Sequence, residues 1–474
     1  MKKLIVPIIL LTGLIVRIIL SFSIEYSITH GISSDDSYYY FRIAQNIVNG
    51  YGSTFDQINK TNGYQPLVLV FLVIVYKIFN SDIFTPVIIS QLILSLISTL
   101  AAFLTFKFVK QISKSEFAGL LSIIFIFLNP VVIAINFKSL ETNFYWLFLI
   151  VTFLFYEKNI KGRETDKSIF QYFVFGLLIS FAAFSRLDGG FYILAFAIFL
   201  LFQKKDLFFN RLKKIFLSGA GFSILFVPYL VYNYLTFGNP VPISGRAKIF
   251  HNHRAILSQV QDYFTLDFFL YEIRRFLFPF NFDLFANRGF GLIEQIAVYI
   301  FIGVIIVFVI IFLRSGYFKR VISQWQGYGF IPLYLLFHYS FYTLYFWEYR
   351  FYYFLPEFIV LSILFAMTIS NWIKDKFPQY EKRTALQISF ITILIFTIGG
   401  IKIFTAQHEQ TLALKTALWI KNNLEKDKVY SSANTGILSY FTQFRFVNLD
   451  GMVNNDELLN AYQKSEDKYL EYLK

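Results

Sequence analysis

The chain has 474 residues, of which 56% are hydrophobic and 15% are charged. A soluble domain carries about 25% charged residues, so this composition excludes an ordinary soluble enzyme, and the apolar bulk excludes a disordered chain. Because the chain has no cysteine, disulfides, thiol catalysis and Cys-based metal sites are also excluded. The formal charge of +13 at pH 7 comes from Lys and Arg in short loops between apolar runs. That arrangement is typical of membrane proteins and does not predict nucleic-acid binding.

Repeated apolar runs predict an all-α polytopic membrane protein with about eleven transmembrane helices. The predicted spans are 4–24, 84–107, 117–136, 143–156, 169–185, 189–203, 215–235, 291–313, 328–346, 351–370 and 385–404. A twelfth run, 66–79, reaches only about 21 Å as a helix, which is less than the ~30 Å hydrocarbon core. We therefore expect 66–79 to lie at the outer interface. The first span contains Arg17 and is followed by no small-residue cleavage site, so it is interpreted as a retained anchor.

Basic loops predict the orientation. If the N-terminus is cytoplasmic and 66–79 does not cross, the basic loops 107–116, 156–168, 203–214, 314–320 and 374–383 all fall inside, as the positive-inside rule requires. We thus expect a multi-pass protein of the cytoplasmic membrane with an extracytoplasmic C-terminal segment.

The expected organisation is a transmembrane domain, 1–404, followed by a small extracytoplasmic α/β cap, 405–474. The first outer loop is 25–83 and the large outer loop is 236–290. In the cap, the sequence predicts a helix near 411–424, a strand near 429–432, a short helix, a strand near 446–450 and a helix from about 455.

Polar clusters with both signs of charge gather on the predicted outer side. Ionisable groups at a membrane boundary are costly unless they are paired or hydrated, so converging ones indicate a functional site. A carboxylate there can accept a proton, while guanidinium and ammonium groups can bind phosphate. The ionisable candidates are Asp35, Asp36, Glu141, Arg186, Asp188, Arg246, Lys248, Glu348, Arg350 and Asp450.

Each candidate also has a purely structural interpretation. Asp35 and Asp36 precede a predicted helix, Ser37 to Asn49, and one of them could simply cap it. Side chains of neighbouring helical residues diverge by about 100°, so we expect one base and one orienting or capping residue. Glu141 is interpreted either as a helix cap or as a site residue.

Two pairs could be plain salt bridges: Arg186 with Asp188, and Glu348 with Arg350. Phosphate contact is the alternative for Arg186, as it is for Arg246 and Lys248 in the outer loop. His251 and His253 are too few to indicate a metal site, and loop polarity is the preferred interpretation.

The order of several short motifs resembles a known family. They are Asp35-Asp36-Ser37-Tyr38, Gly50 to Asp56, Thr61 to Leu67, Asn129-Pro130, Leu140-Glu141-Thr142, Ser185 to Gly189 and Asn448 to Gly451. Together they are similar to the GT-C superfamily of integral-membrane glycosyltransferases, and above all to bacterial and archaeal protein mannosyltransferase-like members.

The resemblance implies a polyprenyl-phosphate-linked sugar donor and an inverting transfer to the hydroxyl of a glycan, lipid or protein acceptor. Asp35 or Asp36 would be the general base, while Arg186, Arg246 and Lys248 would hold the donor phosphate. The expected substrate-binding residues are Tyr64, Gln65, Glu141, Asp188, Glu348, Arg350 and Asp450. Gln65 stands where many relatives carry histidine.

We expect no obligatory metal ion or other cofactor, although some relatives, such as oligosaccharyltransferases, require a divalent cation (Mg²⁺ or Mn²⁺). The alternative functions are a transporter or flippase of lipid-linked sugars, a polymerase or ligase of lipid-linked glycans, and a non-catalytic scaffold. Transporters usually have internal repeats and charges at mid-membrane, whereas here the charges gather at the outer edge. Polymerases and ligases use outward Arg and His clusters rather than an Asp pair in the first loop.

Overall fold

The computed structural model describes residues 4–162, 169–203, 206–257, 313–348, 350–406, 408–464 and 466–473. The predicted span 291–313 and the part of the large outer loop beyond residue 257 lie essentially outside these ranges. The described chain is almost entirely helical, which confirms the predicted all-α membrane fold with a small C-terminal α/β segment.

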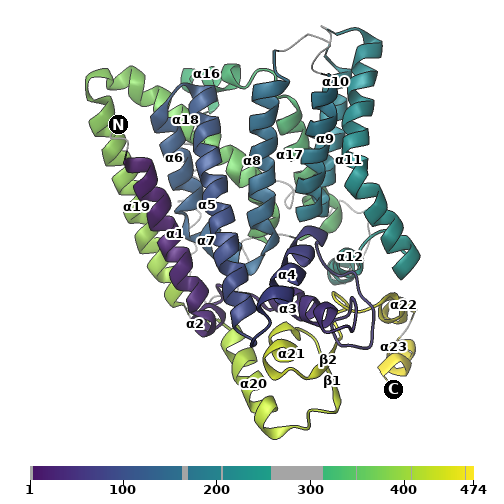
Figure 1. The fold of residues 1–474 in the computed structure, drawn as a ribbon. Coiled ribbons are helices and arrows are strands. Elements are labelled where there is room, and N and C mark those ends of the chain that lie inside the picture. Colours follow the sequence, from purple (N-terminus) through teal and green to yellow (C-terminus); the bar gives the residue numbers. More distant parts are fainter. Residues whose placement is uncertain are drawn as a thin grey trace.

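The helices of the N-terminal half run back and forth between the two ends of the bundle. They are α1 (Ile5–Phe22), α2 (Ile24–Thr29), α3 (Asp35–Val48), α4 (Pro66–Phe79), α5 (Thr85–Ser113), α6 (Glu116–Phe127), α7 (Pro130–Lys138), α8 (Glu141–Asn159), α9 (Ile169–Ser185), the 3₁₀ turn η2 (Leu187–Gly189), α10 (Gly190–Leu201), α11 (Phe208–Phe237) and α12 (Ile243–Leu257). The long helices run side by side, with α3, α4 and α12 below them (Figure 1).

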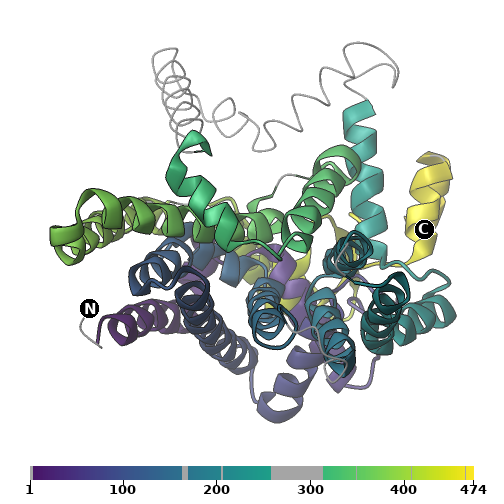
Figure 2. The same ribbon diagram turned by 90° about the horizontal axis from the view of Figure 1, so that it is seen from above.

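The C-terminal half adds a second group of helices and the tail. It comprises α16 (Gly316–Gln324), α17 (Phe330–Ser340), the π-helix η3 (Phe341–Phe346), η4 (Phe351–Phe354), α18 (Leu355–Lys376), η5 (Pro378–Tyr380), α19 (Glu381–Thr405), α20 (Gln410–Asn423), β1 (Val429–Ser432), α21 (Gly436–Thr442), β2 (Arg445–Asn448), α22 (Asp456–Lys464) and α23 (Glu466–Leu473). Seen from above, α16 to α19 lie along one side of the earlier helices (Figure 2).

The number of spans is not fixed by the helix lengths. By length and hydropathy, five helical stretches within the described ranges can cross a membrane, or six if the bent pair α6 and α7 counts as one span. The other apolar helices are shorter, so the predicted count of about eleven stays a prediction. The ten predicted runs that lie within the described ranges are helical, and the run 66–79 forms α4 beside α3, at the end that carries the tail.

One predicted span is broken. The sequence indicates a continuous helix over 117–136, but α6 ends at Phe127 and α7 begins at Pro130, with a bend of 53° between them. Asn129 caps α7, because its side chain accepts a hydrogen bond from Val131 N at 2.9 Å, and proline is favoured at the first helical position. Arg17 stabilises the end of α6 by donating to Phe127 O at 3.0 Å.

The C-terminal segment forms the elements that the sequence predicts and packs against α3. The strands β1 and β2 are parallel and are joined through α21. Tyr440 on α21 packs against Tyr38 on α3, with ring centroids 5.4 Å apart, and its hydroxyl donates to Ile83 O at 2.5 Å. The tail is thus built into the end of the bundle that carries α3 and α4, which we call the site end.

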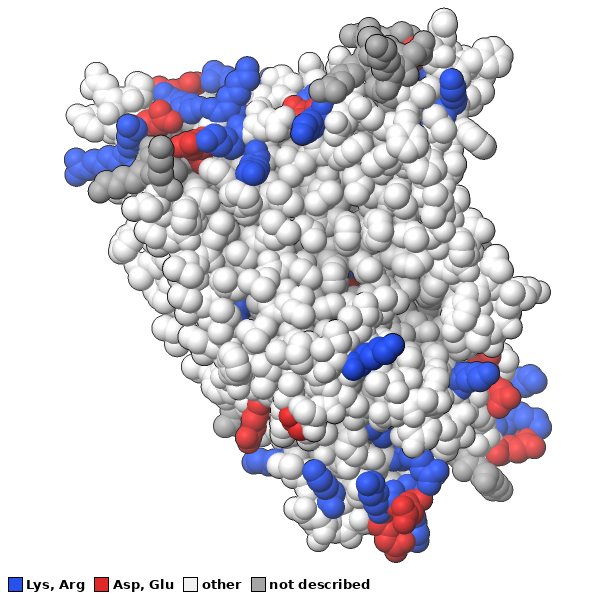
Figure 3. All heavy atoms as spheres, in the orientation of Figure 1, with Lys and Arg blue, Asp and Glu red and all other residues white. Residues whose placement is uncertain are grey.

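On the face shown in Figure 3, charged side chains gather at the two ends of the molecule, while the surface between them is mostly uncharged. The loops predicted to be cytoplasmic meet at the end opposite the site end, where Ser115 and Ser370 hydroxyls lie 2.7 Å apart and Arg320 pairs with Asp375 at 2.9 Å. The apolar belt between the two charged ends is what a lipid bilayer requires.

Candidate functional site

A cavity of about 330 Å³ opens at the site end, where segments distant in the sequence converge. Its walls come from α3, the loop before α4, the α7–α8 turn, the α9–α10 turn, α12, η3 to η4, and the tail. The lining residues used below are Asp36, Gln65, Lys138, Glu141, Arg186, Asp188, Lys248, Tyr342, Tyr352, Tyr353, Met452 and Val453.

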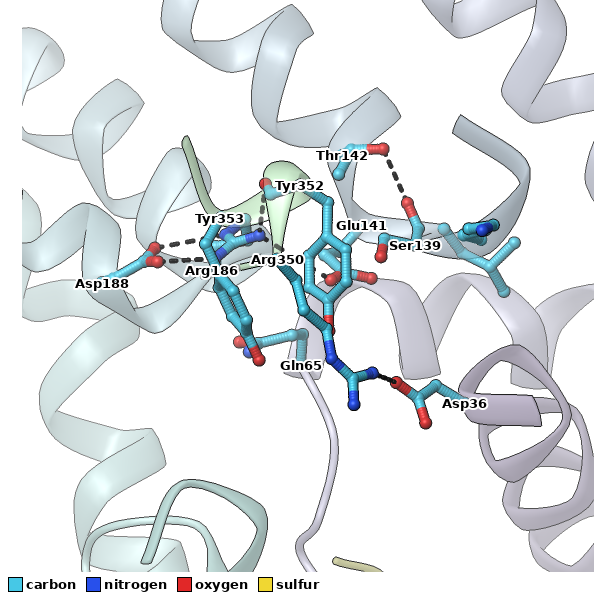
Figure 4. A network of polar contacts seen from close by, with 12 residues as sticks. Asp36, Gln65, Ser139, Glu141, Thr142, Arg186, Asp188, Arg350, Tyr352 and Tyr353 are labelled. Atoms are coloured by element: carbon cyan, nitrogen blue, oxygen red, sulfur yellow. Dashed lines mark hydrogen bonds and ion pairs between the residues drawn. The ribbon is translucent and has the colours of Figure 1, made fainter. Parts of the chain in front are cut away.

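The two adjacent aspartates lie in different environments. Asp36 lines the cavity with 44% of its side chain exposed, and its Oδ2 lies 3.4 Å from a guanidinium nitrogen of Arg350 (Figure 4). Asp35 is buried and does not line the cavity; it accepts hydrogen bonds from Gly436 N at 3.0 Å and Ile437 N at 2.7 Å. Burial raises the pKa of Asp35 to about 6, although these two backbone donors favour its charged form. Asp35 therefore anchors the tail, while Asp36 faces the cavity.

Arg186 forms the inner wall and is held from several sides. Its NH2 donates to Asp188 Oδ2 at 2.7 Å and to the Tyr342 hydroxyl at 3.0 Å, and its NH1 donates to Tyr352 O at 3.1 Å. Glu141 lies 4.0 Å away, on the first turn of α8. Burial works against the charge of Arg186, but Asp188 outweighs it and keeps the pKa of the guanidinium well above its ordinary value.

Lys248 and Arg350 form a second cationic group nearer the opening. Lys248 Nζ donates to the Tyr353 hydroxyl at 2.9 Å and lies 3.9 Å from Glu348. Glu348 also lies 3.4 Å from Arg350 Nε, so it pairs with both cations. The salt bridge between Glu348 and Arg350 that the sequence predicts is present, and Arg350 also contacts Asp36.

Asp35, Glu348 and Arg350 do not line the cavity, and neither do three further candidates. Arg246 pairs with Asp456 at the start of α22. Asp450 shapes a tail turn by accepting from Met452 N at 2.9 Å and from the Tyr39 hydroxyl at 3.1 Å. Tyr64 is buried, with its hydroxyl 2.9 Å from Ser53. Their contacts support the walls of the cavity.

Gln65 links two parts of the wall. Its Oε1 accepts a hydrogen bond from Leu187 N at 3.1 Å, which joins the first outer loop to the turn that carries Arg186 and Asp188. A histidine in the same place would also offer an acceptor nitrogen.

The sequence reasoning left three ionisable residues out of the candidate site. Lys138 lines the cavity at the end of α7, and its ammonium has no ion pair or hydrogen bond among the described residues. The signal was its place on the outer side, where positive charge opposes the orientation rule. His338 and Glu357 lie behind Asp188, inside runs interpreted only as spans. An ionisable residue within a span is itself a functional signal.

Within the described ranges, no group of three or more His, Asp or Glu side chains is arranged to hold a metal ion. His251 Nε2 lies 2.9 Å from Asp450 O and His253 Nε2 lies 2.8 Å from Tyr345 O, so both imidazoles tether α12 to its neighbours.

Comparison with known proteins gives partial sequence matches and whole-chain structural matches. Residues 64–232 match the profile of the dolichyl-phosphate-mannose-protein mannosyltransferase family, and residues 400–474 match a domain of unknown function. No curated protein sequence matches the chain.

Three solved structures are similar in fold. ArnT from Cupriavidus metallidurans, bound to undecaprenyl phosphate, gives a TM-score of 0.56 at 10% identity, covering 96% of this chain and 88% of ArnT. The apo oligosaccharyltransferase of Archaeoglobus fulgidus gives 0.58 at 13% identity, covering 100% of this chain and 68% of that one. The Archaeoglobus fulgidus oligosaccharyltransferase AglB, with an inhibitory peptide and a dolichol-phosphate, gives 0.54 at 13% identity, covering 98% and 68%.

The chain therefore has the fold of ArnT and of the oligosaccharyltransferase AglB, and its residues 64–232 are similar to a mannosyltransferase family. The predicted likeness to protein mannosyltransferase-like members is confirmed. The matched segment contains Gln65, Lys138, Glu141, Arg186 and Asp188, whereas α3 with Asp36 and the tail lie outside it.

Proposed function

We propose that this protein transfers a sugar from a polyprenyl-phosphate donor to an acceptor hydroxyl in the cavity, with Asp36 as the general base. The supporting observation is that the other carboxylates of the site are paired or buried, while Asp36 is accessible. Asp188 is tied to Arg186, Glu141 is buried beside it, and Asp35 holds the tail. Asp36 has an accessible carboxylate at the opening of the cavity, where an acceptor can reach it.

The reaction is a single displacement at the anomeric carbon. The acceptor oxygen forms a bond to that carbon as its proton passes to Asp36, and the bond from the carbon to the phosphate oxygen breaks. The lipid phosphate leaves with the electron pair and gains negative charge, and the configuration inverts. Cations fixed at the position where this charge grows lower the barrier.

Lys138, Arg186 and Lys248 are our candidates for the phosphate. All three line the cavity, and within the described ranges the Lys138 ammonium has no ion pair or hydrogen bond. Arg246 is a weaker candidate, because it pairs with Asp456 away from the lining. The bound undecaprenyl phosphate of ArnT and dolichol-phosphate of AglB support a lipid phosphate as the ligand class here. The sugar would sit near Gln65 and Glu141, and the acceptor is a glycan, lipid or protein hydroxyl.

We further propose that the site faces the outer side of the cytoplasmic membrane and needs no obligatory metal ion. The basic loops lie at the opposite end, as the positive-inside rule requires of a cytoplasmic face. Near Asp36, the positive charge that a divalent cation would supply already comes from Arg350. The ammonium groups of Lys138 and Lys248 and the guanidinium groups of Arg186 and Arg350 make the cavity a poor setting for a further cation.

Transfer of labelled sugar from synthetic polyprenyl-phosphate donors tests the proposal. We expect Asp36→Asn to lower the transfer rate by about 10²- to 10⁴-fold, which is the usual contribution of a general base. Asp35→Asn is the matched control, because it alters the neighbouring carboxylate outside the cavity and should keep most of the rate in properly folded protein. Full activity of the Asp36→Asn protein would exclude the assignment.

The same assay with EDTA checks the metal question. Transfer should be unchanged by the chelator, and a loss that Mg²⁺ or Mn²⁺ restores would show that a divalent cation is required.

A further inference from the structure

Five ionisable side chains form a continuous chain that runs from the cavity wall into the bundle, with alternating formal charge if His338 is protonated. In order they are Glu141, Arg186, Asp188, His338 and Glu357. Arg186 lies 4.0 Å from Glu141 and 2.7 Å from Asp188. His338 Nε2 lies 3.3 Å from Asp188 Oδ2, and His338 Nδ1 lies 2.7 Å from Glu357 Oε1.

The two rear members, His338 and Glu357, do not line the cavity. His338 is completely buried. Glu357 lies in the first turn of α18, and its Oε2 is buried with no hydrogen-bond partner among the described residues. Burying such groups in an apolar bundle is costly, and well-packed apolar side chains are often more stable in their place. A role in the site therefore explains this pair better than stability does.

The imidazole is fixed from both sides. Each ring nitrogen of His338 faces a carboxylate oxygen, and a neutral imidazole has only one N–H to donate. Either His338 carries both protons, or one carboxyl holds the second. The aromatic rings of Tyr334 and Tyr342, one turn before and after His338 on the same helical stretch, lie 5.6 Å and 5.0 Å from it.

Asp188 connects the fixed imidazole of His338 to Arg186. Its two oxygens take Arg186 Nε at 3.4 Å and NH2 at 2.7 Å, a two-point contact that fixes the plane of the guanidinium. Tyr342 also donates to Asp188; it belongs to the π-helix η3, a rare element found frequently at functional sites. Arg186 NH1 donates to Tyr352 O, lies 4.0 Å from Glu141 Oε1 and stands at the wall of the cavity.

We propose that His338, oriented by Glu357, is a positioning residue that fixes Asp188 and, through it, the guanidinium of Arg186 against the donor phosphate. The inference rests on the proposed function, since it takes the ligand of Arg186 to be a lipid phosphate. His338 itself touches neither the donor nor the acceptor.

A double-mutant cycle on the full-length protein in detergent tests this, with affinity for undecaprenyl phosphate as the readout. His338→Gln should weaken binding about ten-fold, because Asp188 loses its contact with the imidazole and no longer holds Arg186 in a fixed orientation. Arg186→Lys keeps the charge but loses the two-point contact. If His338 acts through Arg186, then His338→Gln in the Arg186→Lys background should cost less than about two-fold. If His338→Gln only damages the structure, it should weaken binding by the same factor in both backgrounds, and that result would overturn the proposal.

Glu357→Gln serves as a second, nearly isosteric variant in the same cycle and guards against a His338→Gln protein that does not fold. It should weaken binding a few-fold with Arg186 present and leave it unchanged with Lys in that place. Asp375→Asn, at the far end of the same helix where Asp375 pairs with Arg320, is the matched control and should bind as the wild type does. If both variants bind as tightly as the wild type, the positioning role is refuted while the proposed function stands. If the wild type neither binds this lipid nor transfers sugar, both the positioning role and the proposed function are refuted.

Discussion

At the scale of single residues, Asp35 and Asp36 are adjacent in the chain but serve different parts of the molecule. Consecutive positions on a helix point about 100° apart, so only one carboxylate of such a pair can face a given cavity. The sequence predicts this split into one base and one capping residue. It cannot assign the roles, because the partners of Asp35 lie about 400 residues later, at Gly436 and Ile437.

The buried carboxyl of Asp35 leads to a pH prediction. Burial raises its pKa from 3.8 to about 6, so the folded protein holds the proton more tightly than the unfolded chain does. The contribution of Asp35 to stability is therefore greatest below pH 4 and is lost as pH rises towards 6. Asp35→Asn has no such dependence. Relative to wild type, the variant should gain up to about 3 kcal/mol between pH 4 and 7.

Melting temperatures of the detergent-purified proteins at several pH values check this, with Asp427→Asn as a control at an exposed tail position. The offset between Asp35→Asn and wild type should move in favour of the variant as pH rises. A constant offset would contradict the assignment.

At the scale of elements, hydropathy predicts which runs are helical but not where helix caps interrupt them. The run 117–136 is apolar throughout, and only Asn129-Pro130 marks the start of a new helix within it. The short elements of the tail were predictable because polar residues and glycines punctuate them. His338 and Glu357 could not be connected to Arg186 in advance, since nothing local links α17 and α18 to the α9–α10 turn.

The junction between the first outer loop and the tail depends on one glycine. A Cβ on Gly63 would lie 2.0 Å from Met452 O, so any side chain there forces the backbones apart. Met452 and Val453 line the cavity, and Gly63→Ala should therefore loosen the tail and lower sugar transfer several-fold. Gly219→Ala is the matched control, since a Cβ at this helical glycine meets nothing within 4 Å.

Limited proteolysis of the tail and the transfer assay check this together. Faster tail cleavage and slower transfer are expected for Gly63→Ala, while Gly219→Ala should resemble wild type in both. Wild-type behaviour of the Gly63→Ala protein would mean that the close packing of loop and tail is not needed for the site.

At the scale of the whole molecule, the sequence indicates which end carries the site but not how charges pair within it. Alternation of basic and apolar segments is a property of the chain as a whole, so the sidedness of Asp36, Arg186 and Lys248 follows from counting. Pairing depends on tertiary contacts, such as Arg246 with Asp456, 210 positions later. That contact removes Arg246 from the predicted set of phosphate ligands that line the cavity.

The orientation in the membrane gives the last prediction, and the absence of cysteine makes it directly testable, because an introduced thiol is unique. Lys114 is exposed at the end of α5 opposite the site, and Lys426 is exposed in the tail. A membrane-impermeant maleimide should label the Lys426→Cys protein in intact cells but label the Lys114→Cys protein only after the membrane is opened. The opposite pattern would place the cavity on the cytoplasmic face. Labelling of both in intact cells would mean that the two ends of the bundle are not on opposite sides of the bilayer.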